Sequence, residues 1–410
     1  MTSDPQEAYV WTWLPRAEDP VVAGRLQARG PIVTFTYGRS YLARAEAIPL
    51  SLPELPLETG ALSPRVGEIA GCIADAAPDA WGQRVILNRW SGRGAVDTAE
   101  LNFLTYLLES GSDRIGALDF QTSPDEYVPR SIEHAELIEL AESAERVEQG
   151  IALSPALDQA LLHGRSVGGA RPKALLTEGA RGLIAKFSST TDTYPVVKGE
   201  FLAMELARRA GLDVATVQLT HALGNDVLLI DRFDRPVSGG RRAMVSALTI
   251  LELDDLGGRY ASYPDLADRI RSRFTNPRAT LTELFSRITF NVLTGNTDDH
   301  ARNHSAFWDG TSLTLTPAYD ICPQLRAGGE TAQAMAIGRD GDRMSQVVRC
   351  VAHAGSYLLS EADARTIVDH QIEVITTKWS DVCDVAHLSE VDRAQLWHRQ
   401  FLNAYATDEY

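Results

Sequence analysis

The N-terminal third of the chain changes its pattern of apolar and polar residues near residue 68. Within 9–41, short runs of alternating apolar and polar residues are separated by glycine or proline. Alternation with a period of two is typical of strands with one buried face, so these runs predict a small antiparallel β-rich module. From 68 to 109 the apolar residues are spaced by three and four, which predicts helices that close the module. The same spacing within 133–148 predicts another helix, which is rich in glutamate on its other positions.

The middle of the chain, residues 179–235, predicts a strand, a helix from about 197 to 210 that is stopped by a glycine, and then two more strands. A β-helix-β-β order of this kind is compatible with half of a two-lobed nucleotide-binding fold. Beyond Asp255 helical spacing predominates. It is interrupted by the polar segment GNTDDHARN and by a hairpin whose turn signal is Asp309-Gly310.

Composition limits the classes of function that the chain can have. Its 410 residues, 44% of them hydrophobic and 23% charged, can bury the cores of two or three lobes. The 39 Lys and Arg against 55 Asp and Glu leave a net charge of −16, which repels phosphate backbones and acidic lipid surfaces. Any contact with nucleic acid is therefore expected to be local or to depend on a partner.

Cysteine usage and the first residues predict a soluble, cytoplasmic protein. The four cysteines lie far apart without a CxxC pair, so we expect free thiols in a reducing compartment: Cys72, Cys322, Cys350 and Cys383. The first residues are acidic where a signal peptide needs basic ones. Apolar runs are also much shorter than the roughly 20 residues of a membrane span.

A glycine-rich turn, SVGGARPK at residues 166–173, precedes an apolar strand. Two adjacent glycines let main-chain N–H groups approach an anion, and Arg171 and Lys173 add positive charge. The alternative for this segment alone is an ordinary turn. Lys186 lies in the next alternating strand, and Glu200 opens the helix that follows, an arrangement with which protein kinases hold the lysine that contacts phosphate. The alternative for Lys186 is a solvated lysine on the wet side of its strand.

The most specific stretch is NTDDHARN, from Asn296 to Asn303, with a second aspartate, Asp320, after the hairpin. Phosphoryl transfer needs one aspartate to orient the attacking hydroxyl, and an asparagine and another aspartate to hold magnesium through oxygen. The alternative is a polar loop whose side chains bond to its own backbone. Because this loop lies between an apolar helix and an apolar strand, the phosphoryl-transfer interpretation is favoured.

Other chemistries explain less of the sequence. His300 and His304 are four residues apart, but the glutamate of an HExxH zinc motif is missing. A metal-dependent hydrolase that uses the aspartates leaves the glycine-rich turn and Lys186 unexplained. GxGxxG and GxxxxGK[ST] motifs, which would indicate a Rossmann or Walker nucleotide site, are not found. A kinase accounts for the turn, the lysine strand, the VLLIDRFDR segment and the NTDDHARN loop together.

These motifs resemble those of the HipA family of serine/threonine kinases, the toxins of type II toxin–antitoxin pairs. The resemblance covers nearly the whole chain and is carried by FTYGRSYLARAEAIPLSLPELPL, AAPDAWGQRVI, SVGGARPKA, KGEFLAMELARRAGLDVA, LLIDRFDR, GNTDDHARNHSAF and LTPAYDI. It implies an α+β, two-lobed, protein-kinase-like fold. The expected parts are a β-rich subdomain with closing helices at 1–110, a nucleotide-binding N-lobe at 111–235 and a helical C-lobe at 236–410.

The resemblance also implies roles for individual residues. Asp298 would be the catalytic aspartate, Lys186 and His300 would be further catalytic residues, with Lys186 on the nucleotide phosphates, and Asn303 and Asp320 would hold Mg²⁺. Ser166 falls where the family has its inhibitory autophosphorylation serine. Contacts with ATP are expected from the following residues: Gly168, Gly169, Ala170, Arg171, Pro172, Lys173, Lys186, Asp231, Arg232, Phe233, Asp298, Asp299, His300, Tyr319 and Asp320. Asp231 replaces a hinge glutamate of the best-known member, and Asp299 and Arg302 replace its glycine and lysine.

As a toxin of this family, the chain would use ATP and Mg²⁺ to phosphorylate a serine of a protein, such as an aminoacyl-tRNA synthetase. A small helix-turn-helix antitoxin of the HipB type would neutralise it, and operator DNA would be reached only through that complex. No membrane partner is implied. The alternatives are an idle module that serves only to dock the antitoxin, and a small-molecule kinase with a different pocket.

Overall fold

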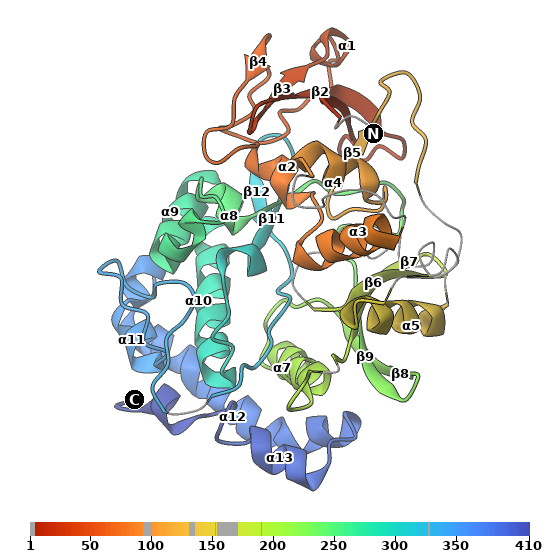
Figure 1. Ribbon diagram of the computed structural model, residues 1–410. Coiled ribbons are helices and arrows are strands. Elements are labelled where there is room, and N and C mark those ends of the chain that lie inside the picture. Colours follow the sequence, from red (N-terminus) through yellow and green to blue (C-terminus); the bar gives the residue numbers. More distant parts are fainter. Residues whose placement is uncertain are drawn as a thin grey trace. The chain divides into compact units, whose positions relative to one another are not determined.

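The computed structural model describes residues 5–92, 101–130, 136–151, 153, 171–189, 191–326 and 329–410, and the structural statements below concern these residues. The chain folds into two compact units, which can be followed by sequence colour in Figure 1. Unit 1 comprises Met1–Thr191, Thr220–Val245 and Phe307–Thr311. Unit 2 comprises Asp192–Leu219, Ser246–Ala306 and Ser312–Tyr410. The predicted division at 110 and 235 stays a prediction.

A sheet of five strands in the order β4-β3-β2-β1-β5 forms the N-terminal part of unit 1 and confirms the predicted β-rich module. In this sheet Val10 lies opposite Gly24, and a Cβ at Gly24 would come within 2.2 Å of the Thr36 carbonyl oxygen. Only glycine fits where the strands approach so closely. The strands are β1 (Glu7–Thr12), β2 (Val21–Arg29), β3 (Ile32–Tyr37), β4 (Ala61–Leu62) and β5 (Leu118–Gln121). The accompanying helices are α1 (Arg39–Leu42), α2 (Gly71–Asp75), α3 (Ala80–Gly92) and α4 (Phe103–Glu109).

A second sheet, in the order β6-β7-β9-β8, is covered on one face by α5 (Leu137–Glu148) and α3. Its strands are β6 (Lys173–Glu178), β7 (Arg181–Phe187), β8 (Val217–Ala222) and β9 (Asn225–Asp231). Trp81 of α3 and Leu140 and Ala144 of α5 pack with Ala185 and Phe187 of β7 in one buried cluster. The helix predicted within 133–148 is therefore confirmed, with its apolar face on the sheet (Figure 1).

Unit 2 is mostly helical, as predicted. Its long helix α10 (Pro277–Thr294) packs against α9 (Tyr263–Arg273), α11 (Val347–Ala352) and α12 (Glu361–Val385). Helix α7 (Val196–Arg209), which the sequence placed at about 197–210, packs against α12. The remaining helices are α8 (Ala247–Ile250), α13 (Glu390–Leu396), and the 3₁₀ turns η3 (Gly257–Tyr260), η4 (Ala301–Asn303), η5 (Ala354–Tyr357) and η6 (Ala404–Thr407).

The predicted hairpin around Asp309-Gly310 is confirmed. Strands β11 (Ser305–Trp308) and β12 (Leu313–Leu315) pair with each other, and β10 (Met244–Ser246) lies on the other side of β11. The chain thus has the α+β fold that its patterns predict, and the polar segment 296–304 connects the end of α10 to the start of β11.

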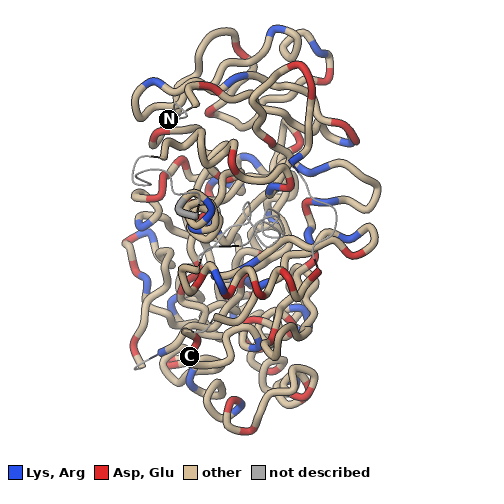
Figure 2. The backbone as a smooth tube through the Cα atoms, turned by 45° about the vertical axis from the view of Figure 1, so that its right-hand side comes forward, with Lys and Arg blue, Asp and Glu red and all other residues tan. Residues whose placement is uncertain are grey.

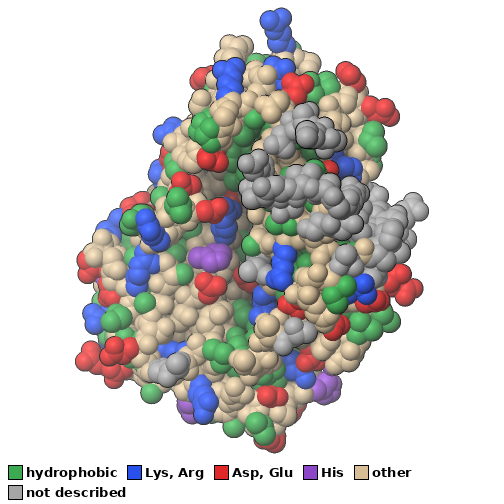
Figure 3. All heavy atoms as spheres, in the orientation of Figure 1, with side chains coloured by type: hydrophobic (Ala, Val, Ile, Leu, Met, Phe, Trp, Pro, Cys, Tyr) green, Lys and Arg blue, Asp and Glu red, His purple; other side chains and the backbone are tan. Residues whose placement is uncertain are grey.

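Charge is distributed over the chain rather than gathered in one block. Figure 2 shows acidic and basic residues alternating along the backbone, and on the face drawn in Figure 3 side chains of both signs are interspersed. The thiols of Cys72, Cys322, Cys350 and Cys383 are all buried and form no disulfide, as predicted. In the part of the chain that the structure describes, no helix has the length and apolar character needed to cross a membrane.

Candidate functional site

The polar loop 296–304 begins where α10 is forced to end. Gly295 adopts a left-handed conformation with φ of 69°, and its amide bonds to the last turn of the helix. A Cβ at this position would lie 2.8 Å from the Gln400 carbonyl oxygen, so both the backbone angle and the space require glycine. The helix end is thereby anchored, and the loop starts from a defined point.

Within this loop the backbone carbonyl of Asp298 accepts hydrogen bonds from the His300 amide at 2.8 Å and from the Asn303 side-chain amide at 3.2 Å. The loop therefore does bond to its own backbone, as the alternative interpretation of this segment supposed. The Asp298 carboxylate, however, is exposed, and among the described residues it has no hydrogen-bond partner. Since the nitrogen of the Asn303 amide is already used, its oxygen is the atom available to a ligand.

The second aspartate, Asp320, is held near this loop in an unusual backbone conformation. Its φ is 59°, a left-handed angle that costs a residue other than glycine roughly 1 kcal/mol or more. The Asp320 carbonyl accepts a hydrogen bond from the Asn296 side chain at 3.4 Å, and the preceding Tyr319 donates its hydroxyl to the Arg302 carbonyl at 2.6 Å. These two bonds join the Tyr319-Asp320 segment to the loop.

The carboxylates of Asp298 and Asp320 influence each other. Partial burial raises the pKa of the Asp298 carboxyl above its ordinary value, and the Asp320 charge adds to this shift while the His300 ring opposes it. A divalent cation would relieve the repulsion between the two aspartates, and carboxylate and amide oxygens are the ligands that Mg²⁺ prefers. Asp298, Asn303 and Asp320 all belong to unit 2, so the structure brings these three predicted residues together. No group of three or more His, Cys, Asp or Glu side chains within the described ranges could hold a metal ion.

Asp299 behaves differently from its neighbour. It is only 2% exposed, and its carboxylate accepts hydrogen bonds from the Tyr263 hydroxyl at 2.6 Å and the His304 ring nitrogen Nε2 at 2.9 Å. Burial and the Asp299 charge raise the pKa of Tyr263, so its hydroxyl remains a donor. We predicted Asp299 among the residues that contact ATP, whereas in this structure its carboxylate is turned into the protein. We call Tyr263, Asp299 and His304 the Asp299 cluster.

In unit 1 the predicted phosphate-contacting lysine lies directly opposite another lysine. Lys186 of β7 pairs with Lys173 of β6 across the antiparallel ladder, so their side chains share one face of the sheet. Lys173 is 1% exposed, and its ammonium lies 3.2 Å from the Asp79 carboxylate. Trp81 donates its indole N–H to the Lys173 carbonyl at 3.0 Å. The Asp79 carboxylate of the AAPDAWGQRVI segment thus offsets the Lys173 charge, and the predicted contact of Lys173 with ATP stays a prediction.

The predicted adenine-side segment is tied down by a buried ionic network. Arg232 is fully enclosed and binds Asp234 with two hydrogen bonds, at 3.0 and 2.8 Å, and Asp113 with one at 2.8 Å. Arg235 contacts the same two carboxylates at 2.8 Å. Burial alone would raise the pKa of the Asp113 carboxyl, but the Arg232 and Arg235 charges outweigh it and hold the pKa well below its ordinary value. We call Asp113, Arg232, Asp234 and Arg235 the Arg232 cluster.

This segment also uses part of its backbone in the sheet. The Arg232 amide donates to the Gly182 carbonyl at 2.9 Å, so that N–H is not available to a base. Asp231 pairs with Arg181 at 2.5 Å, and the Phe233 ring lies edge-on to the Phe307 ring at 5.9 Å between centroids. The expected contacts of Asp231, Arg232 and Phe233 with adenine stay a prediction.

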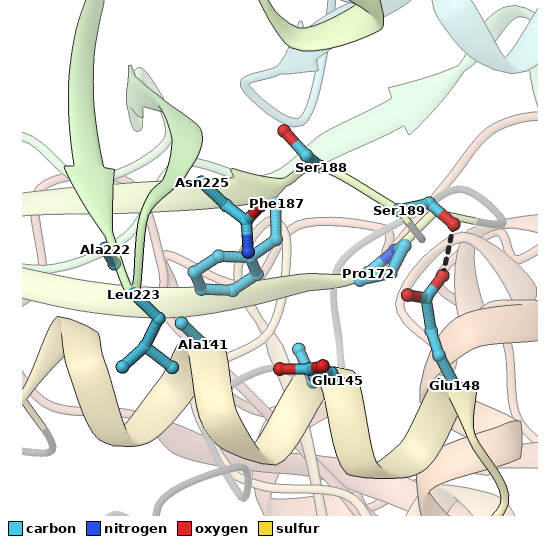
Figure 4. Close-up of a pocket in the computed structure, with 11 residues that line it drawn as sticks. Ala141, Glu145, Glu148, Pro172, Phe187, Ser188, Ser189, Ala222, Leu223 and Asn225 are labelled. Carbon is cyan, nitrogen blue, oxygen red and sulfur yellow. Dashed lines mark hydrogen bonds between the residues drawn. The ribbon is translucent and has the colours of Figure 1, made fainter. Parts of the chain in front are cut away.

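A small cavity in unit 1 lies between α5 and the sheet (Figure 4). Phe187 and Leu223 supply apolar walls, and Glu148 at the rim accepts a hydrogen bond of 2.6 Å from the Ser189 hydroxyl. Because successive side chains of a strand point to opposite faces, Lys186 points away from the face that Phe187 lines. This cavity is therefore not the place where Lys186 would meet a phosphate.

The sequence reasoning did not identify Tyr263, Asp79 or Asp113, which support the predicted residues. Their contacts join positions that are 36 to 119 residues apart, and no spacing rule relates such positions. Ser166, Gly168, Gly169 and Ala170 lie outside the described residues, so the predicted phosphate loop and autophosphorylation site stay predictions. Arg171 and Pro172 are described, and Pro172 borders the cavity of Figure 4.

Comparison with known proteins places the chain in a family. The family model described as HipA-like C-terminal domain matches residues 165–379, and the model of the HipA N-terminal domain matches residues 18–121. The serine/threonine-protein kinase toxin HipA of Shewanella oneidensis is 26% identical over 43% of this chain and 47% of that protein. A candidate kinase of Sinorhizobium fredii, Y4mE, is 29% identical over 34% of this chain and 33% of that protein. The chain thus spans about half, or less, of the length of the curated relatives it matches.

The solved structures agree on the fold. A chain in the complex of HipA, HipB and operator DNA from Shewanella oneidensis MR-1 superposes with a TM-score of 0.67, at 21% identity, over 94% of this chain and 97% of that one. At this identity the likeness establishes the α+β, kinase-like fold. The two family models, which together match most of the sequence, establish the family: the chain belongs to the HipA family.

Proposed function

We propose that this chain is an ATP-dependent serine/threonine protein kinase and the toxin of a HipA/HipB-type pair. Membership of the HipA family supports the class, and the kinase toxin of Shewanella oneidensis and Y4mE are relatives of the kinase type. The observation that carries the proposal is an exposed Asp298 carboxylate in a loop where the Asn303 side-chain amide donates to the Asp298 backbone carbonyl and which is joined to Asp320.

The residues of unit 2 fit this chemistry. Asp298 would accept the proton of the substrate hydroxyl as that oxygen attacks phosphorus, which is the role of the catalytic aspartate in kinases. The Asn303 amide oxygen and the Asp320 carboxylate fit Mg²⁺, and His300 is exposed beside Asp298. When bound, Mg²⁺ and ATP would supply the phosphoryl group and the positive charge that stabilises it. Tyr319, whose hydroxyl bonds to the Arg302 carbonyl, would keep Asp320 in position.

The residues of unit 1 would bind the nucleotide. Lys186 would contact the phosphates, and the glycine-rich segment with Arg171 would cover them. Asp79 pairs with Lys173, which lies opposite Lys186 on the sheet, so this carboxylate would reduce the repulsion between the two ammonium groups.

For partners, we propose a small, basic helix-turn-helix antitoxin of the HipB type. The related Shewanella structure is a complex of HipA with HipB and operator DNA. A net charge of −16 opposes direct binding of DNA by this chain and favours a partner that carries the basic surface. The substrate would be a serine of a protein, with a component of translation such as an aminoacyl-tRNA synthetase as the first candidate, and Ser166 would be the site of autophosphorylation.

The test is incubation of the purified chain with Mg²⁺ and ATP, followed by mass spectrometry of the protein itself and of added candidate substrates. The wild type should incorporate phosphate, and Asp298→Asn should reduce the rate by about 10²–10⁴-fold because the hydroxyl loses its proton acceptor. Asp408→Asn, an exposed aspartate of the same unit, is the matched control and should retain the wild-type rate. A wild type without transfer, or an Asp298→Asn variant at the wild-type rate, would refute the proposal. Phosphate found only on a small molecule would replace it with a small-molecule kinase.

A further inference from the structure

Asp299 and its two partners form a buried cluster beside the residues proposed for catalysis. Tyr263 is 0% and His304 3% exposed, and both donate to the same carboxylate oxygen, Oδ2 of Asp299. The two rings also lie edge-on, with centroids 5.8 Å apart. A buried carboxylate is costly unless its oxygens accept hydrogen bonds, so the side chains of all three residues are held in one arrangement.

The position of this cluster in the chain gives it a consequence. Asp299 directly follows Asp298, and His304 directly follows Asn303. The hydrogen bond between Asp299 and His304 therefore joins the two ends of the loop segment next to Asp298 and Asn303. Asp298 is exposed while its neighbour Asp299 is buried, so the two side chains lie in different surroundings. Fixing Asp299 inside the protein therefore fixes the direction in which Asp298 leaves it.

Tyr263 connects the closed loop to the helical part of unit 2. It is the first residue of α9, and its amide donates to the Ala336 carbonyl at 2.9 Å. Two residues earlier in that segment, the Ala334 amide donates to the Thr297 carbonyl at 3.0 Å. The loop is thus held at two points, at the Thr297 carbonyl by the Ala334 amide and at the Asp299 carboxylate by the Tyr263 hydroxyl.

We propose that Tyr263, Asp299 and His304 are positioning residues for phosphoryl transfer, which clamp the 296–304 loop so that Asp298 and Asn303 are held at their working separation. This inference rests on the proposed kinase function. The three side chains are too deeply buried to touch substrate or nucleotide, so they act only through the residues that adjoin them in the chain. His304 Nδ1 has no partner among the described residues, so the imidazole contributes to the cluster only through Nε2, which donates to the Asp299 carboxylate.

Variants that remove one donor at a time test the clamp. Tyr263→Phe and His304→Leu should each lower kcat by about 10- to 100-fold, because a displacement of about 1 Å at catalytic groups has effects of this size. His304→Gln can place an amide N–H where Nε2 lies, and it should restore most of the lost kcat. KM for a protein substrate should change by less than about threefold, since the clamp does not touch the substrate.

The matched control is Thr289→Val, which removes a buried hydrogen bond of 2.9 Å to Gln371, away from the loop. It should lower the unfolding temperature as the clamp variants do, yet leave kcat within twofold of the wild type. Equal loss of kcat in Thr289→Val, or no rescue by His304→Gln, would show that the cluster only stabilises the fold and would overturn the inference.

Hydrogen exchange separates failure of the clamp from failure of the proposed function. The amides of His300 and Asn303 are bonded within the loop, so they should exchange slowly in the wild type and at least about tenfold faster in Tyr263→Phe. Thr289→Val should leave them protected. If the wild type transfers no phosphate, the proposed function fails, and exchange alone decides whether the cluster holds the loop. Unchanged exchange in both Tyr263→Phe and His304→Leu would overturn the clamp whatever the activity.

Discussion

The Arg232 cluster in unit 1 and the Asp299 cluster in unit 2 hold two segments in place by different means. In the first, two guanidinium groups and two carboxylates neutralise one another inside the protein. In the second, a single carboxylate is surrounded by a phenol and an imidazole. Both clusters hold irregular segments that follow a regular element, β9 in one case and α10 in the other.

The difference between them shows how each segment is attached. The Arg232 cluster joins residues 113–116 to 232–235, which are more than 100 positions apart in the sequence. Its charged groups make several hydrogen bonds, so the attachment is strong, but it depends on every partner because loss of one leaves a charge without its partner. The Asp299 cluster closes a loop of six residues and needs only one anchor from outside, Tyr263. Removal of one partner should therefore destabilise the first cluster more than the second.

Arg232→Leu should have the largest effect on stability. It leaves the buried Asp234 carboxylate and the partly exposed Asp113 carboxylate without their main counter-charge, and we expect the free energy of unfolding to fall by about 3–5 kcal/mol. Urea unfolding measures this change. Arg181→Leu is the control, because Arg181 is half-exposed and its ion pairs should contribute about 1 kcal/mol or less. Equal losses in the two variants would contradict the buried network as the source of stability.

Tyr263→Phe should come next, with a loss of about 1.5–3 kcal/mol in the free energy of unfolding, since it removes one hydrogen bond to a charged group and leaves His304 in place. Thermal unfolding followed by circular dichroism can measure it. Tyr410→Phe, which removes the more exposed hydroxyl bonded to Asp369, is a suitable control and should cost less. If Tyr263→Phe lost as much free energy of unfolding as Arg232→Leu, the Asp299 cluster would depend on each partner as strongly as the Arg232 cluster, which would contradict the comparison.

Acid should weaken the Arg232 cluster specifically. The pKa of Asp113 is lowered in the folded protein, so near pH 4 the unfolded chain binds more protons and stability rises with pH. This contribution is complete above the ordinary aspartate pKa of about 4 and is lost as the pH falls through the lower folded value. Because the Asp113 side chain is one-third exposed, Asp113→Asn should cost only about 1 kcal/mol at pH 7. The difference in free energy of unfolding between the wild type and Asp113→Asn should therefore shrink in acid. A difference that stays constant from pH 7 down to the lowest pH at which the protein folds would contradict the lowered pKa of Asp113.

Arg302→Ala should have the smallest effect. Its ion pair with Asp255, at 2.6 Å, lies at the surface of the same loop, and exposed pairs contribute about 0.5 kcal/mol. Chemical denaturation in low and high salt measures it, and the small loss should shrink further as salt screens the pair. A loss comparable to that of Tyr263→Phe would mean that the loop is held from its outer side as well as by the Asp299 cluster.

Local patterns predicted the elements well. The alternation around Lys186 and Phe187 predicts β7, the glycine after the 197–210 spacing predicts the end of α7, and Asp309-Gly310 predicts the hairpin of β11 and β12. Each of these signals depends on neighbours in the chain, because backbone angles and the faces of helices and strands are set within a few residues. The types of residue in the NTDDHARN loop likewise pointed to the chemistry of the site.

What only the tertiary structure decided is which of two similar residues faces the solvent. By residue type and position alone, Asp298 and Asp299 are neighbouring aspartates of one loop, and Lys173 and Lys186 are two lysines in strands. Tyr263, 36 residues from Asp299, and Asp79, 94 residues from Lys173, bury one member of each pair. Such partners are chosen by desolvation and hydrogen bonding between elements that meet only in the folded chain, which no local spacing records.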